Sequence, residues 1–218
     1  MTLDFCAECA KLLDGTADEK QADRVEGAFP HCKCENYQVG RESPGPVGSH
    51  EIIYRMVVSP AYIDWNAKKI LEDSFRNAAS NGLSVFREIA TDDDITALAI
   101  ERLSRKSTAK PKSIQAIIRL KVEMVRALKS NDVDGRLFCV YDETVPRRDA
   151  TLPRVPTHVT ILQRLPQPKI ADRNRMIRDG HFELYKLAET DLMNINDFRD
   201  GLLLDLNNRS LAGDFILT

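Results

Sequence analysis

The sequence predicts an α+β protein in two parts, a small zinc-ribbon-like N-terminal module and a larger domain with a mixed or antiparallel sheet, flanking helices and a helical C-terminus. Three observations favour this division. Four of the five cysteines lie within the first 34 residues, a Gly- and Pro-bearing stretch follows, and strand-like and helix-like runs then interleave. We therefore expect a metal-binding module at 1–34, a linker at 35–50 and an α+β domain at 51–218.

The bulk composition is that of a globular protein with its own core. Of the 218 residues 43% are hydrophobic and 29% are charged, while the net charge of −2 gives no overall attraction to nucleic acid or anionic lipid. No apolar run approaches the roughly 18 residues that span a bilayer, and the first residues lack a basic and then apolar signal pattern. We expect a cytoplasmic protein without membrane contact, whose thiols are reduced.

The cysteine spacing predicts a structural zinc site. Cys6 and Cys9 are separated by two residues, and Cys32 and Cys34 by one. Zinc favours four such ligands supplied as two local pairs. A helix over 17–29, capped by Thr16, is predicted between the pairs. Few large apolar side chains occur in this module, so a metal contributing about 10 kcal/mol would stabilise its fold.

Two points about the sulfur ligands stay open. His31 lies beside the second pair and could replace one sulfur, and reduced thiols without a metal, or a disulfide, are the alternatives. The fifth cysteine, Cys139, stands in the middle of an apolar run. We expect it to be a buried packing residue.

The sequence of the first half of the larger domain predicts two strand–helix pairs. Strands are predicted at 51–58 and 83–88, where β-branched, aromatic and alternating residues gather. An amphipathic helix is predicted at 65–80, ended by Asn81 and Gly82. A second helix is predicted at 91–106, because acidic residues fill its first turn and basic residues its last.

The second half continues with strands and ends in helices. We expect a strand at 113–121, a helix at 122–129, a turn at 131–135 and a strand at 136–141. A Pro- and Arg-bearing loop at 146–156 precedes a strand at 157–165. Helices are predicted at 170–189 and near 195–206.

No phosphate-binding loop, dinucleotide fingerprint, serine elbow or HExxH zinc motif occurs in the chain. Scattered polar residues remain as catalytic candidates. His158 and Thr160 share one face of a predicted strand. Arg55 and Ser84 lie on two other predicted strands, and Glu143 follows a fourth.

An arginine on one strand, a serine on another and a glutamate on a third resembles the general arrangement of ADP-ribosyltransferase folds. Here Arg55 and Ser84 carry the likeness together with the acidic Asp142 and Glu143 at the end of a later strand; they are single residues and not a contiguous motif, and no one glutamate is singled out. The resemblance implies that the arginine and serine hold a dinucleotide, while the glutamate orients a ribose hydroxyl.

These observations lead to three functional hypotheses. The first is an accessory or interaction protein, whose zinc module docks a partner protein. The second is an ADP-ribosyltransferase-like or other nucleotide-using enzyme. The third is nucleic-acid binding through the zinc module and the basic stretches at 102–112 and 147–154.

Overall fold

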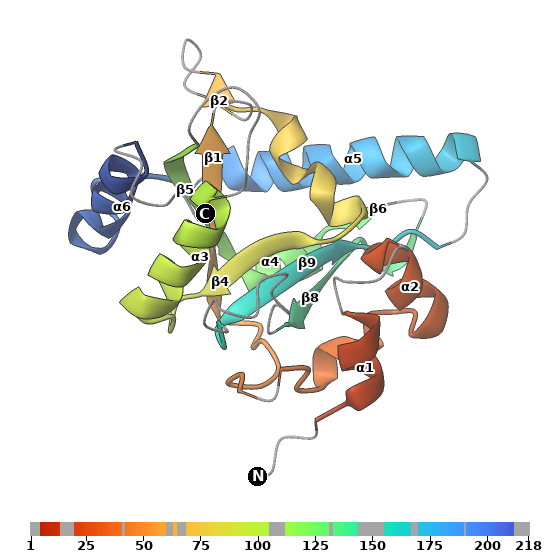
Figure 1. Cartoon of the computed structure of the whole chain (residues 1–218). Helices are drawn as coiled ribbons and strands as arrows, with labels where there is room; N and C mark the ends of the chain where they lie inside the picture. Colours follow the sequence, from red (N-terminus) through yellow and green to blue (C-terminus); the bar gives the residue numbers. More distant parts are fainter. Residues whose placement is uncertain are drawn as a thin grey trace.

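The computed structural model describes residues 5–13, 20–40, 42–59, 63–64, 69–104, 112–130, 133–143, 155–166, 170–189 and 191–211. At its centre lies a six-stranded antiparallel sheet with the strand order β10-β5-β1-β4-β9-β8 (Figure 1). Its strands, in chain order, are β1 (Ile52–Ser59), β4 (Leu83–Arg87), β5 (Ser113–Lys121), β8 (Phe138–Asp142), β9 (His158–Gln163) and β10 (Leu192–Asn194). Two short hairpins, β2 (Ile63–Asp64) with β3 (Lys69–Ile70) and β6 (Lys129–Ser130) with β7 (Val133–Arg136), stand outside it.

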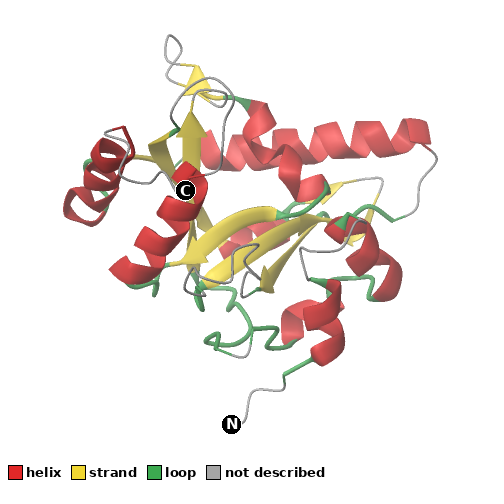
Figure 2. Cartoon of the chain, in the orientation of Figure 1, coloured by secondary structure: helices red, strands yellow, loops and turns green. Residues whose placement is uncertain are grey.

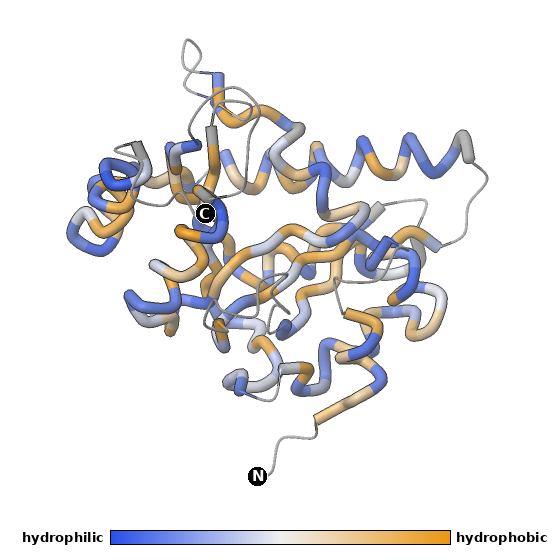
Figure 3. Tube along the Cα trace, viewed as in Figure 1, coloured by the Kyte–Doolittle hydropathy of each residue, from blue (hydrophilic) through white to orange (hydrophobic). Residues whose placement is uncertain are grey.

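One face of the sheet is covered by helix α5 (Ile170–Glu189), the 3₁₀ helix η2 (Glu72–Ala79) and α4 (Val122–Ala127) (Figure 2). We call it the α5 face. Along α5 hydrophobic and hydrophilic residues alternate, as one buried helix side requires (Figure 3). Alternate strand residues such as Ile53, Val85 and Ile161 belong to one hydrophobic cluster with Leu184 of α5. These side chains form the main core.

The opposite face is covered in two halves. Over β5, β1 and β4 lie α3 (Asp92–Ser104) and α6 (Leu202–Leu211), packed on aromatic side chains that include Tyr54 and Phe86. Helix α3 begins with a reciprocal cap, because Thr91 Oγ1 accepts from Asp94 N–H and an Asp94 carboxylate oxygen accepts from Thr91 N–H. The acidic first turn predicted from the sequence thus caps this helix.

The other half, over β9 and β8, is covered by the start of the chain. We call residues 5–13 and 20–40 the N-terminal segment; it holds α1 (Ala7–Leu12), α2 (Gln21–Ala28) and the 3₁₀ helix η1 (Lys33–Asn36). Its buried Leu13 and Val25 form one cluster with Tyr141 and Leu162 of the sheet. The segment therefore packs on the larger domain along its length.

Residues 39–40 and 42–51, mostly within the predicted linker, are anchored to the sheet. Asp142 accepts hydrogen bonds from the Val39 N–H, at 3.1 Å, and from the Ser43 hydroxyl, at 2.5 Å. The Arg87 guanidinium donates to the Gly45 carbonyl and pairs with the Glu51 carboxylate. The boundaries proposed at 34 and 50 remain predictions about independent folding, but these contacts join the predicted linker to the larger domain, as the buried cluster joins the N-terminal segment to it.

The structure confirms an α+β fold and gives its sheet as antiparallel throughout. The predicted helix at 65–80 differs: the chain forms β3 and then η2, and residues 65–68 lie outside the described ranges. Helix α2 begins at Gln21, while Thr16, its predicted cap, also lies outside them. Among the described residues, none of the helices combines the length and apolar character that crossing a bilayer demands.

Candidate functional site

The side chains of Ser84 and His158 meet on the sheet face that the N-terminal segment and α3 cover. Ser84 is paired with Thr160, and Phe86 with His158, across the antiparallel strands β4 and β9. Ser84 and His158 are therefore diagonal neighbours, which is within reach of side chains. Ser84 Oγ lies 2.6 Å from His158 Nε2. Two residues 74 positions apart are brought into hydrogen-bond contact by the register of these strands.

The second ring nitrogen fixes the direction of that hydrogen bond. His158 Nδ1 lies 2.9 Å from the main-chain carbonyl oxygen of Glu143. A carbonyl oxygen only accepts, so Nδ1 carries the proton and Nε2 of the neutral ring is an acceptor. Ser84 therefore donates its hydroxyl proton to His158. This is the arrangement in which an imidazole can remove a proton from a serine hydroxyl.

The N-terminal segment contributes a contact to the same site. Gln21 of α2 is buried and donates from Nε2 to the Glu143 carboxylate at 3.0 Å and to the Leu13 carbonyl at 2.6 Å. A Cβ added to Gly82, two residues before Ser84, would lie 3.4 Å from Gln21 Oε1. Gln21 thus lies between the start of β4 and Glu143, whose main-chain carbonyl contacts the His158 ring.

Ser84 lies at the boundary between the part of this sheet face covered by α3 and α6 and the part covered by the N-terminal segment. Phe86, two residues further along β4, packs in the cluster of α3 and α6, whereas Leu162 of β9 packs in that of the N-terminal segment. His158 is buried, with 2% of its surface exposed, and Ser84 retains intermediate exposure. Of the two residues, Ser84 is therefore the one that a small molecule could approach.

Arg55 is not part of this group. It alternates with Tyr54 along β1 and so points to the α5 face, where its guanidinium donates to the main-chain carbonyls of Ser74, at 2.6 Å, and Ser84, at 3.3 Å. The structure brings together Ser84, His158 and the Glu143 main chain, and places the Arg55 side chain on the other side of the sheet. Arg55 is buried and helps to hold η2 to β4.

The cysteines form two disulfides. Cys9 is bonded to Cys34 and Cys32 to Cys139, and Cys6 is free. Cys139 is buried, as expected, but it joins the N-terminal segment covalently to β8. A bonded sulfur is not a thiolate, so the oxidised chain does not offer the four ligands Cys6, Cys9, Cys32 and Cys34 that zinc would need.

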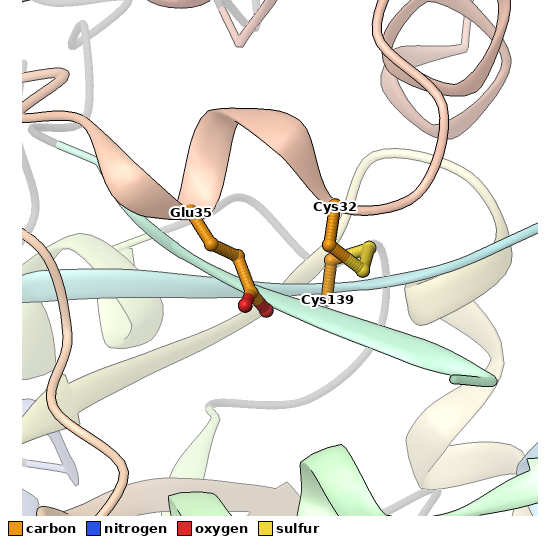
Figure 4. Close-up of side chains that lie close together, drawn as sticks. All are labelled: Cys32, Glu35 and Cys139. Atoms are coloured by element: carbon orange, nitrogen blue, oxygen red, sulfur yellow. A yellow bond between two sulfur atoms is a disulfide. The ribbon is translucent and has the colours of Figure 1, made fainter. Parts of the chain in front are cut away.

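In the described residues, one group of potential ligand atoms lies within 4.8 Å of one another, that of Cys32, Glu35 and Cys139 (Figure 4). The Glu35 carboxylate already faces two guanidinium groups, of Arg136 at 2.7 Å and of Arg126 at 3.1 Å, and accepts from the Val140 N–H. Its charge is thereby compensated, and a cation would have to displace these partners. The group does not fit a metal ion, and zinc stays a prediction for the reduced chain.

Other candidates lie apart from the Ser84 site. His31 is exposed, and its Nδ1 lies 3.3 Å from an Arg164 nitrogen. The basic loop at 147–154 lies outside the described residues, as do 105–111 of the basic stretch at 102–112. Sequence reasoning missed both the Cys32–Cys139 pairing and the role of Gln21. Neither carries a local signal, because each contact joins residues more than 100 positions apart.

Comparisons of this chain with models of protein families, with curated proteins and with solved structures gave no match. Arguments about its function therefore rest on the geometry of its own residues.

Proposed function

We propose that this chain is a serine-dependent hydrolase of acyl compounds. In this proposal Ser84 is the nucleophile, His158 the general base, and the Glu143 main-chain carbonyl orients the imidazole. The observation that supports it is the 2.6 Å separation between Ser84 Oγ and His158 Nε2. A hydroxyl in contact with an imidazole that a third group holds is the general signature of an activated nucleophile.

The chemistry follows from the positions of the protons. Ser84 Oγ attacks the acyl carbon of an ester or amide while its proton passes to His158 Nε2. The imidazolium returns that proton to the leaving alcohol or amine, which leaves an acyl-serine. Water then gives a proton to Nε2 and attacks the acyl group, and Ser84 Oγ regains its proton as the acid departs. A neutral carbonyl stabilises imidazolium less than a carboxylate does, so we expect slow turnover.

The three roles expected from the sequence remain predictions. The zinc-dependent accessory role was favoured because no catalytic grouping could be recognised, and the present proposal offers one in Ser84 and His158. The ADP-ribosyltransferase-like role needs Arg55 and Ser84 to hold one ligand, yet Arg55 serves two main-chain carbonyls on the opposite face. The nucleic-acid role rests largely on loops outside the described ranges.

A fluorophosphonate probe, which reacts covalently with activated serines, tests the proposal. We expect the wild-type protein to gain one phosphonyl group, located on Ser84 by peptide mass spectrometry. Ser84→Ala should abolish the labelling. His158→Gln, which keeps a hydrogen-bonding amide but provides no base, should slow it by about 100-fold or more.

Two matched variants control for loss of a serine or a histidine elsewhere. Ser80→Ala removes the hydroxyl of a serine at the turn before β4, and His50→Ala removes an exposed histidine whose contact is with Glu123. Both should label like the wild type. A folded wild-type protein that takes up no probe, or labelling that His158→Gln leaves unchanged, contradicts the proposal; circular dichroism establishes folding.

A further inference from the structure

Of the five cysteines, all of which the structure describes, Cys6 is the one outside a disulfide. It is the N-cap residue of α1, and its Sγ accepts a hydrogen bond from the Cys9 N–H at 3.4 Å. Cys6 is partly exposed, whereas Cys9 and Cys34 are 1% and 0% exposed. A free and partly exposed cysteine therefore stands three residues before one end of a buried disulfide.

Cys6 is also fixed relative to the other end of that disulfide. Its N–H donates to the Gln38 carbonyl at 3.0 Å, and Phe5 forms a parallel bridge with Gln38. Gln38 lies two residues after η1, the element that holds Cys34. Through α1 and through this bridge, Cys6 is tethered to the segments that carry both bonded sulfurs.

We propose that this cluster is a thiol–disulfide exchange site, in which Cys6 attacks the Cys9–Cys34 bond. The Cys6 thiol loses its proton to solvent, and its thiolate bonds to Cys9 Sγ. The bond between Cys9 and Cys34 breaks, and the Cys34 thiolate leaves and takes up a proton. One disulfide replaces another, so the exchange needs neither oxidant nor reductant.

The exchange replaces a disulfide between two buried cysteines by one that includes the partly exposed Cys6. A small dithiol can then attack Cys6 Sγ, which releases the Cys9 thiolate. The second thiol of the reagent closes its own disulfide and frees Cys6, so the reagent is oxidised as the protein bond is reduced. Cys6 is thereby the entry point through which small thiols act on Cys9 and Cys34. This proposal is independent of Ser84 and His158.

Peptide mapping under non-reducing conditions tests the exchange directly. Wild-type protein is held at pH 6 and pH 9 and trapped with N-ethylmaleimide. We expect both the Cys9–Cys34 linkage with alkylated Cys6 and the Cys6–Cys9 linkage with alkylated Cys34, reached faster at pH 9 because the thiolate attacks. Detection of the Cys9–Cys34 linkage alone at both pH values, or of no disulfide at these residues, overturns the proposal.

A kinetic measurement tests the role of Cys6 as an entry point. Dithiothreitol should reduce the Cys9–Cys34 bond about tenfold more slowly in Cys6→Ser than in the wild type. Within the same molecules, reduction of Cys32–Cys139 should be unchanged, which controls for altered folding. Glu8→Gln, an exposed change in the same helix, should behave like the wild type. Equal rates for Cys9–Cys34 in Cys6→Ser and the wild type overturn the proposal.

Discussion

Cys32 in the N-terminal segment is bonded to Cys139 in strand β8, across 107 positions of the sequence. Three residues after Cys32, the Glu35 carboxylate accepts a hydrogen bond from the Val140 N–H. A disulfide and a hydrogen bond therefore hold η1 against β8, the edge strand of the sheet. Glu143 follows the last residue of β8, and its main-chain carbonyl accepts a hydrogen bond from the His158 ring. The strand that anchors the N-terminal segment thus leads directly into the candidate site.

The Cys32–Cys139 bond should contribute strongly to stability. We expect the double variant Cys32→Ala/Cys139→Ala to lose about 4 kcal/mol of unfolding free energy under non-reducing conditions, because the bond closes a long loop and restricts the unfolded chain. Urea denaturation followed by circular dichroism measures the loss. In excess dithiothreitol the difference between wild type and variant should fall to nearly zero; a difference of equal size in reductant would show that side-chain packing, and not the cross-link, is responsible.

Gly82 should tolerate no side chain. Its φ is +84°, and an added Cβ would lie 2.2 Å from Thr160 Cγ2. Gly201 provides a matched control, since its φ is +85° and an added Cβ meets nothing within 4 Å. We expect Gly201→Ala to lose about 1 kcal/mol from backbone strain, and Gly82→Ala to lose about 3 kcal/mol or more because overpacking is added. Urea denaturation measures both.

We attribute the larger loss of unfolding free energy in Gly82→Ala to the contact with the Thr160 methyl group. A second variant tests this contact separately. Replacing Thr160 by Ser removes the methyl group, so Gly82→Ala/Thr160→Ser should recover part of the stability lost by Gly82→Ala. Equal losses for Gly82→Ala and Gly201→Ala would mean that the contact with Thr160 relaxes without cost.

The pH dependence of stability that Asp142 contributes should be opposite in sign to that of a carboxylate whose pKa is lowered on folding. Burial raises the pKa of Asp142 above its ordinary value of 3.8, although hydrogen bonds from Ser43 and Val39 and the charge of Arg87 lower it in part. Between the two pKa values the folded protein binds more protons than the unfolded chain. The contribution of this group is therefore fully present below about pH 3.8 and is lost as the pH rises through the raised pKa.

An Asp142→Asn variant separates this contribution from those of other carboxylates. We expect the unfolding free energy of the variant minus that of the wild type to increase as the pH rises above about 3.8 and through the raised pKa of Asp142, since the amide does not titrate. Urea denaturation at a series of pH values gives the difference. A difference that is constant, or that decreases with pH, contradicts the raised pKa.

Elements with a strong local pattern were predictable to within a residue or two. The runs at 113–121 and 170–189 form β5 and α5 with those bounds, and the run at 51–58 forms β1 at Ile52–Ser59. In each of them β-branched residues, or apolar residues at helical spacing, favour one conformation before any tertiary contact is made. The helix predicted at 65–80 was wrong in its extent, because the chain there forms β3 and then η2.

The sequence by itself determined the α+β class, the candidate residues and the unusual density of cysteines at one end of the chain. Only the tertiary structure decided which candidates meet. The register between β4 and β9 places Ser84 against His158, the alternation of β1 turns Arg55 to the other face, and the packing of the N-terminal segment on β8 gives Cys32 a partner in Cys139. Pairing between distant strands depends on the packing of the whole sheet, and no local pattern of residues encodes it.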